Sequence, residues 1–116
     1  MSKSYRDLLV WQKSFNMCVD IYEKCQTLPE TEKYNLISQI TRCAVSIPSN
    51  IAEGQQRNST KEFVHFLSIA RGSAAELSTQ LLLASKIYKI DIDALLHEVE
   101  EVQKMLFVLQ KKLNRN

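Results

Sequence analysis

The sequence predicts an all-α protein: a single domain of 116 residues folded as an antiparallel up-down-up-down four-helix bundle. Three observations carry this prediction. Glycine and proline occur only twice each, which leaves few residues that interrupt helices. Apolar residues recur at alternating spacings of three and four along four segments, as they do on one face of a helix. The connections between these segments are short, so consecutive helices are expected to lie side by side in opposite directions.

The first helix is expected over residues 7–26. Its most regular apolar stripe contains Leu8, Trp11, Phe15, Cys18, Tyr22 and Cys25. A second apolar set, Val10, Met17 and Ile21, lies off that stripe. Two apolar faces on one helix indicate that the helix is covered on more than one side. Leu28 and Pro29 end the helix, and either Thr27 or Thr31 can cap the next one.

The second helix is expected over residues 31–54. Its narrow apolar seam consists of Ile37, Ile40, Ala44, Ile47 and Ile51. Pro48 lies inside this pattern, removes one backbone donor and frees the carbonyl of Ala44. We expect a kink at Pro48 rather than a helix end, because Ile51 continues the seam. Gly54 is then a plausible left-handed stop.

The third helix is expected over residues 60–89 and the fourth over residues 92–114. Ser59 and Glu62 form a capping box at the start of the third helix. Apolar residues keep heptad spacing from Phe63 to Tyr88, which favours near-parallel packing. Gly72 costs about 1 kcal/mol relative to alanine inside a helix, and we expect a close neighbouring backbone to offset that cost. Asp91 or Asp93 caps the fourth helix.

Motifs in the second and third helices carry a family resemblance. They are Ser38-Gln39-Ile40, Arg42, Ser46-Ile47-Pro48, Asn50-Ile51-Ala52-Glu53-Gly54 and Ile69-Ala70-Arg71-Gly72-Ser73. These motifs resemble the four-helix-bundle proteins encoded in intervening sequences of bacterial 23S ribosomal RNA genes. The accessory variability protein of diversity-generating retroelements is similar to that family. The resemblance covers nearly the whole chain, and it implies ring-shaped homopentamers.

A polar stripe follows one face of the second helix. It consists of Gln39, Arg42, Ser46, Asn50 and Glu53. One interpretation is an ordinary solvated face, and another is an exposed phosphate contact at Arg42. Serine and asparagine are poor residues for the middle of a helix. We therefore expect the stripe to form a hydrogen-bonded network with another helix or another subunit, including a buried charge pair between Arg42 and Glu53.

The chain has more apolar helix flanks than a single four-helix bundle needs. The surplus residues are Val10, Met17, Ile21, Ile69, Leu83 and Ile87. They are candidates for the interface of a homo-oligomer, and the family resemblance favours a pentamer.

Basic residues are partly segregated, although the formal net charge is only +2. The candidate phosphate contacts are Lys13, Lys24, Lys61, Arg71, Lys86, Lys89, Lys104, Lys111 and Arg115. A solvated face is the ordinary alternative. A ring-shaped oligomer would repeat these cations around its axis, so that the phosphate contacts of all copies contribute to the affinity. The first hypothesis is an oligomeric, non-catalytic protein that binds RNA or DNA, and the alternative is a scaffold that binds another protein, such as a polymerase, through apolar flanks.

The sequence offers no catalytic constellation, and we expect no cofactor and no metal. Glu62 precedes His65 by three residues, but this pattern occurs once and the capping box already uses Glu62. Cys43 lies beside Arg42, where a thiol of low pKa is conceivable, but we expect a small packing residue. Three observations favour a cytoplasmic protein. The three cysteines lack zinc-ligand spacing, the N-terminus lacks a signal peptide, and no apolar run is long enough to span a membrane.

Overall fold

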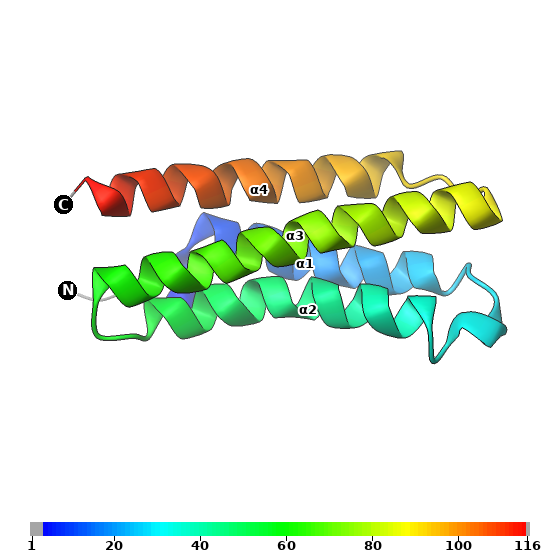
Figure 1. The fold of residues 1–116 in the computed structure, drawn as a ribbon, viewed down its shortest axis with the longest axis horizontal. Coiled ribbons are helices and arrows are strands. Elements are labelled where there is room, and N and C mark those ends of the chain that lie inside the picture. Colours follow the sequence, from blue (N-terminus) through cyan, green and yellow to red (C-terminus); the bar gives the residue numbers. More distant parts are fainter. Residues whose placement is uncertain (1–3, 116) are drawn as a thin grey trace.

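Four α-helices account for most of the chain in a computed structural model that describes residues 4–115. They are α1 (Leu9–Cys25), α2 (Leu36–Gln55), α3 (Thr60–Tyr88) and α4 (Asp93–Asn114). A 3-10 turn, η1 (Tyr5–Asp7), precedes α1, and a second one, η2 (Glu30–Glu32), lies between α1 and α2. Consecutive helices run in opposite directions along a rod of 46 × 20 × 19 Å (Figure 1). The predicted all-α four-helix fold is confirmed.

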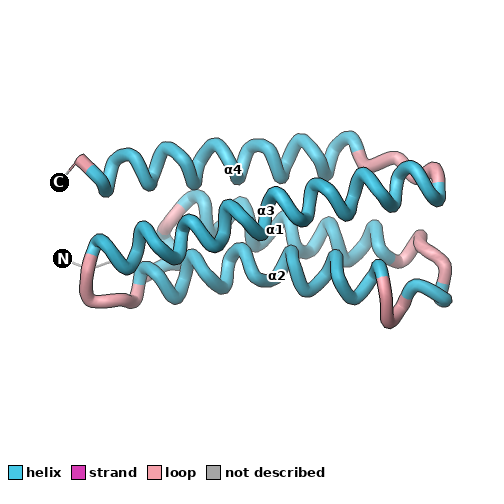
Figure 2. The backbone as a smooth tube through the Cα atoms, in the orientation of Figure 1, coloured by secondary structure: helices cyan, strands magenta, loops and turns pink. Residues whose placement is uncertain are grey.

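The helices occupy the four corners of a square. Each helix packs against the helices before and after it in the chain, and α1 also packs against α4. The connections lie only at the two ends of the rod (Figure 2). One end of the rod, at the left of Figure 1, therefore holds the starts of α1 and α3 and the ends of α2 and α4. None of the helices described within residues 4–115 is long and apolar enough to cross a membrane.

The predicted caps of α2 and α4 need correction. The η2 turn delays the start of α2 to Leu36, and neither Thr27 nor Thr31 caps it. The carboxylate of Glu32 instead accepts a hydrogen bond from the Leu36 amide at 3.3 Å. At the start of α4 the N-cap residue is Ile92, and Asp91 accepts a hydrogen bond from the Asp93 amide at 3.0 Å.

The Ser59 cap predicted at the start of α3 is confirmed, and Glu62 reaches back to the Ser59 hydroxyl rather than to the Ser59 backbone amide. The Ser59 hydroxyl oxygen accepts a hydrogen bond from the Glu62 amide at 3.1 Å, and the same hydroxyl donates to the Glu62 carboxylate at 3.1 Å. The left-handed residue expected at Gly54 occurs elsewhere: Lys89, with φ of 56°, follows the last turn of α3.

The buried face of α1 carries the residues that were predicted to form an oligomer interface. Val10, Met17 and Ile21 are buried, together with Ser14 and Cys25. They belong to the core of one copy and cannot form an oligomer interface, so that prediction is wrong. The larger side chains of Phe15 and Tyr22 remain 48% and 51% exposed. The buried stripe of α1 packs in a core that α2, α3 and α4 fill with leucine, isoleucine, valine and alanine.

The seam predicted for α2 is largely confirmed, and α2 continues through Pro48. Ile40, Ala44, Ile47 and Ile51 are fully buried, whereas Ile37 only borders the core. The carbonyl of Ala44, which loses its usual donor at Pro48, accepts a hydrogen bond from the Cys18 thiol of α1 at 3.1 Å.

Neither glycine has the role that was expected for it. Gly54 lies inside α2, and a Cβ atom added there would stand 2.7 Å from the Cβ of Phe66. This is the kind of close approach that the sequence predicts at Gly72. A Cβ atom added at Gly72 would meet nothing within 4 Å, so no neighbouring backbone within residues 4–115 explains that glycine.

Candidate nucleic-acid interface

Two of the predicted cations meet over one aromatic ring. Arg71 of α3 and Lys111 of α4 both lie against Phe107, with Cζ 5.0 Å and Nζ 5.2 Å from the ring centroid. Phe107 is 44% exposed, so the ring and its two cations face solvent. Each such contact stabilises a cation at an exposed site by about 0.5–1 kcal/mol. The ring therefore holds together two positive charges that would otherwise repel each other.

A buried glutamine fixes the position of Arg71. Gln110 of α4 is only 6% exposed, and its Oε1 accepts a hydrogen bond from the Arg71 guanidinium at 2.8 Å. Its Nε2 donates to the Val64 carbonyl at 3.0 Å and to the Ser68 hydroxyl at 2.7 Å. These bonds join α3 to α4 and use both ends of the amide. Arg71 is thereby oriented by a neutral group, which does not neutralise its charge.

We refer to Arg71, Phe107, Gln110 and Lys111 as the Arg71–Lys111 cluster. Within residues 4–115, no carboxylate lies within 4.0 Å of either cation of the cluster. Arginine without a carboxylate partner retains free donors for a phosphate or another anion. Lys61, in the first turn of α3, and Arg115, directly after α4, lie toward the same end of the bundle as Lys111.

The structure does not bring the other predicted cations to this cluster. Lys13 of α1 forms an ion pair with Glu101 of α4 at 2.5 Å, and its hydrogen bond lowers the pKa of that carboxyl. Lys24, Lys86 and Lys89 lie toward the opposite end of the rod. Lys104 borders a separate hollow between α1 and α4.

In the part of the chain that the structure describes, the polar stripe of α2 forms no network with another helix. Arg42 is exposed and donates to the Ser38 hydroxyl at 3.2 Å, and Asn50 donates to the Ser46 carbonyl at 2.7 Å. Gln39 bonds to Asn35, and Glu53 pairs with Arg57 at 3.0 Å. All these partners belong to α2 or its immediate flanks. The predicted buried pair of Arg42 and Glu53 is therefore wrong, whereas a contact of the stripe with another subunit stays a prediction.

Cys43 is a packing residue rather than a reactive one. Its thiol donates to the Ser73 carbonyl of α3 at 3.0 Å. Burial, with a smaller contribution from the charge of Glu76, raises the pKa of Cys43 to about 11. His65 lies edge-on against Phe66. In the part of the chain that the structure describes, no three His, Cys, Asp or Glu side chains gather as potential metal ligands.

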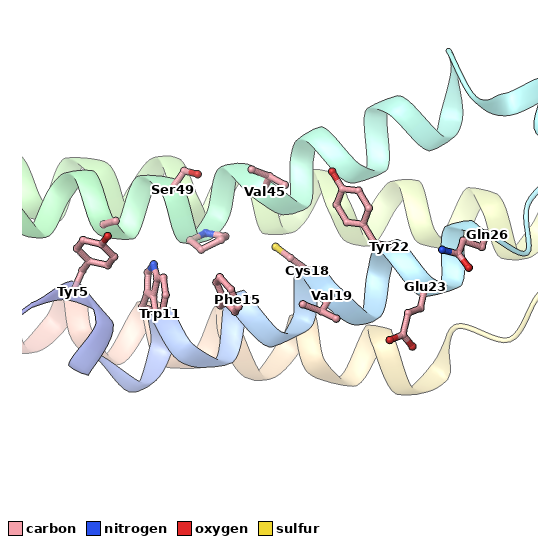
Figure 3. A pocket seen from close by; sticks show the side chains of 12 residues that line it. Tyr5, Trp11, Phe15, Cys18, Val19, Tyr22, Glu23, Gln26, Val45 and Ser49 are labelled. Carbon is pink, nitrogen blue, oxygen red and sulfur yellow. The ribbon is translucent and has the colours of Figure 1, made fainter.

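Sequence reasoning missed an apolar groove between α1 and α2, which Figure 3 shows from close by. Its volume is about 600 Å³. Its walls include Tyr5, Trp11, Phe15, Val19 and Tyr22 on one side and Val45, Pro48, Ser49 and Ala52 on the other. The groove was missed because the regular spacing of the aromatic stripe of α1 favours a place in the core. The presence of two apolar stripes on one helix was the signal that could have revealed it.

The outer surface of α3 carries the remaining candidates for an oligomer interface. Ile69, Leu83 and Ile87 are all exposed, in agreement with a position outside the core. Their role in an assembly stays a prediction.

Comparisons with known proteins agree with this fold. The family model described as 23S rRNA-intervening sequence protein matches residues 6–108. A similar crystal structure is that of a protein with unknown function from the S23 ribosomal protein family of Bacteroides thetaiotaomicron. The two chains share 28% sequence identity and superpose with a TM-score of 0.82, over 89% of this chain and 96% of that one. A comparison with curated proteins found no match.

Proposed function

The chain belongs to the 23S rRNA-intervening sequence protein family, and on this basis we propose that it is a non-catalytic, homo-oligomeric protein of the cytoplasm that binds RNA or DNA. The observation that carries the proposal is the Arg71–Lys111 cluster, in which two cations without a carboxylate partner among residues 4–115 are held on one exposed ring. Binding proceeds largely through phosphates, which are the groups that such cations recognise without regard to base sequence.

The geometry of the cluster suits a phosphate backbone. Gln110 and Phe107 restrict the Arg71 guanidinium before any ligand arrives, so less side-chain freedom is lost on binding. Lys61 and Arg115 lie toward the same end of the rod and extend the positive surface. In a homo-oligomer, for which we favour a pentamer, each copy repeats these contacts, and the affinities combine.

A second candidate function is a scaffold that binds another protein, such as a polymerase. The observation that favours it is the exposed aliphatic set Ile69, Leu83 and Ile87, of which Ile87 is 58% exposed. Exposed apolar surface of this kind is typical of protein–protein contacts. Such binding would depend weakly on salt, which separates it from phosphate recognition.

The test is fluorescence anisotropy with labelled RNA and DNA, single-stranded and duplex, between about 50 and 200 mM salt. We expect the affinity of the wild-type protein to fall steeply with salt. Arg71→Gln and Lys111→Gln should each weaken binding to all sequences. Each should also reduce the salt slope by about one unit for every phosphate that the variant no longer neutralises.

Lys13→Gln is the matched control, because Lys13 is already paired with Glu101 on the other side of α4. It should leave binding nearly unchanged. Wild-type protein without salt-dependent binding would overturn the proposed function. Equal effects of Lys13→Gln and Arg71→Gln on binding would show that the Arg71–Lys111 cluster is not the nucleic-acid site.

A further inference from the structure

The seam between α1 and α4 opens into a hollow of about 410 Å³ at the end of the rod where α1 begins. We refer to it as the α1–α4 hollow. Its floor consists of apolar side chains that belong to the core or border it: Leu8, Val10, Met105 and Leu109. Two further apolar side chains that line it, Leu9 and Val108, are 70% and 51% exposed. A concave apolar floor with an uncovered apolar rim is typical of a ligand site.

The hollow exists because the chain before α1 turns away from α4. The η1 turn packs against α1 and α2, where the Tyr5 ring lies edge-on against Trp11 at a centroid distance of 5.3 Å. In the part of the chain that the structure describes, α4 is not among the packing partners of η1. The ion pair of Lys13 with Glu101 sets α1 and α4 level with each other. From this level α1 begins only four residues earlier, whereas α4 continues for thirteen residues, so the last turns of α4 extend past α1.

Two lysines of α4 stand along one wall of the hollow. Lys104 and Lys112 are exposed, and they lie eight residues apart, which is about 12 Å along a helix. Within residues 4–115, neither lysine has a carboxylate within 4.0 Å. Asp7 of η1 also lines the hollow. Two lysines and one aspartate leave the lining with one positive charge in excess, which a ligand with one negative charge would match.

We propose that the α1–α4 hollow binds a single-chain amphiphile with one negative charge, such as the carboxylate of a medium-chain fatty acid. The apolar lining consists of leucine, valine and methionine side chains, which suit a flexible aliphatic chain, and methionine adapts to irregular shapes. The carboxylate stays at the water-exposed rim, within reach of Lys104 or Lys112. A lysine stem packs along an apolar chain while its ammonium group reaches the head group.

The extent of the apolar surface favours an amphiphile that is free in solution over the surface of a bilayer. Leu9 and Val108 flank a concave site. A helix that lies in a bilayer instead presents a continuous apolar face along its length. The concave shape therefore encloses one chain and offers little to a flat array of lipids.

Isothermal titration calorimetry with hexanoate, octanoate, decanoate and dodecanoate, each below its micelle concentration, tests the apolar part of the site. Each methylene group that enters the hollow should raise the affinity up to about fourfold. The rise should stop once the chain is longer than the hollow. An affinity that does not change between hexanoate and decanoate would overturn the proposal.

A comparison of head groups on the same chain tests the charge. Decanol should bind up to about fivefold more weakly than decanoate for each lysine that contacts the carboxylate. Decylammonium should bind more weakly still, because the lysines repel it. Equal affinities for the three compounds would overturn the assignment of an anion.

The lysines are tested by substitution. The double variant Lys104→Gln with Lys112→Gln should lose the preference for decanoate over decanol and keep the affinity for decanol. Asp7→Asn should tighten the binding of decanoate, because it removes the negative charge from the lining. A double variant that retains the full preference would overturn the role of the lysines.

A charged residue at the rim tests the location. Val108→Glu should weaken decanoate binding by more than about tenfold, because an ionised group then stands beside the chain. Circular dichroism should show unchanged helical content, since Val108 is exposed. Leu82→Glu is the matched control, because Leu82 is 52% exposed against 51% for Val108 and does not line the hollow. Equal loss of binding in both variants would place the ligand elsewhere.

Two further measurements separate this site from other surfaces. Cosedimentation with phosphatidylglycerol vesicles should show no binding, and a protein that binds these vesicles but not decanoate would overturn the free amphiphile as the ligand. Arg71→Gln should leave the affinity for decanoate unchanged, because Arg71 contacts Phe107 and Gln110 outside the hollow. The proposal is therefore independent of the nucleic-acid function, and either can fail alone.

Discussion

The thiol of Cys18 donates a hydrogen bond to the carbonyl oxygen of Ala44, with Sγ 3.1 Å from the oxygen. This carbonyl is the one that Pro48 deprives of its normal donor four residues later in α2. Burial raises the pKa of Cys18 to about 11, so the thiol keeps its proton at neutral pH and remains a donor. A side chain of α1 thus compensates a backbone defect in α2.

The first prediction concerns this compensation. Cys18→Ala should lower the free energy of unfolding by about 1 kcal/mol, because the carbonyl of the buried Ala44 then loses its partner, whereas Cys18→Ser retains a donor and should cost less. In a Pro48→Ala background the backbone amide can bond to Ala44 again, so Cys18→Ala should cost measurably less there. Urea denaturation of the four variants measures the coupling. Equal costs in both backgrounds would show that the thiol does not replace the missing amide.

The second prediction concerns the pH dependence of stability. Burial raises the pKa of Glu98 from its ordinary 4.5 to about 7, and a hydrogen bond to Asp20 and the charge of Asp20 add to this, while Lys13 opposes it. The folded protein therefore holds a proton that the unfolded chain has already released. The free energy of unfolding should fall as pH rises from about 4.5 to 7.

Glu98→Gln removes the titrating group and should flatten that fall. Denaturation at pH 4 and pH 8 should show little difference from wild type at the lower pH and a more stable variant at the higher pH. Glu100→Gln is the control, because Glu100 is exposed on the same helix. A wild-type stability that rises between pH 5 and 7 would contradict the raised pKa.

The third prediction uses the two glycines as a matched pair. Gly54→Ala should destabilise the protein by about 1–3 kcal/mol, because the new methyl group would stand 2.7 Å from the Cβ of Phe66 and force the two helices apart. Gly72→Ala adds the same group where nothing lies within 4 Å. It should leave the free energy of unfolding unchanged or raise it by up to about 1 kcal/mol, measured at submicromolar concentration. Equal effects at the two positions would refute the close approach at Gly54.

The fourth prediction concerns Gln110. Gln110→Leu leaves the Val64 carbonyl and the Ser68 hydroxyl without their partner and should lower the free energy of unfolding by about 1–3 kcal/mol. It also releases Arg71, so nucleic-acid binding should weaken in the same variant. Gln103→Leu, one heptad earlier on α4, is the matched control for the change of side chain. Normal binding by a folded Gln110→Leu variant would mean that Arg71 needs no orientation.

Local patterns were sufficient to predict much of the fold. The Ser59 cap of α3 depends only on residues three positions apart, and the structure confirms it. The continuation of α2 beyond Pro48 followed from Ile51, which keeps the apolar spacing on the far side of the proline. In both cases the determining contacts lie within one helix or at its end, where spacing along the chain fixes geometry.

Features that depend on how helices meet were not predictable in the same way. On α1 both stripes have helical spacing, and only the space left by the other three helices shows that Met17 points inward and Phe15 outward. The nine cations were grouped by helix, but the meeting of Arg71 with Lys111 on Phe107 depends on the register between α3 and α4. The sequence alone does not distinguish Gly54 from Gly72, because the two glycines differ in the atoms of other helices that lie next to them.

The elongated shape of the bundle leaves more surface exposed to water than a rounder shape would. Monomeric proteins of 13.4 kDa expose about 6,500 Å² of surface by the usual scaling with mass, whereas this rod exposes 7381 Å². In a thin rod nearly every residue lies close to the surface, so a single copy buries less apolar area than a rounder fold of equal mass. Lengthening the helices would not correct this ratio, because surface and volume grow together along a rod. A thicker rod has less surface for its volume, and rods that pack side by side form a thicker body although each chain keeps its length.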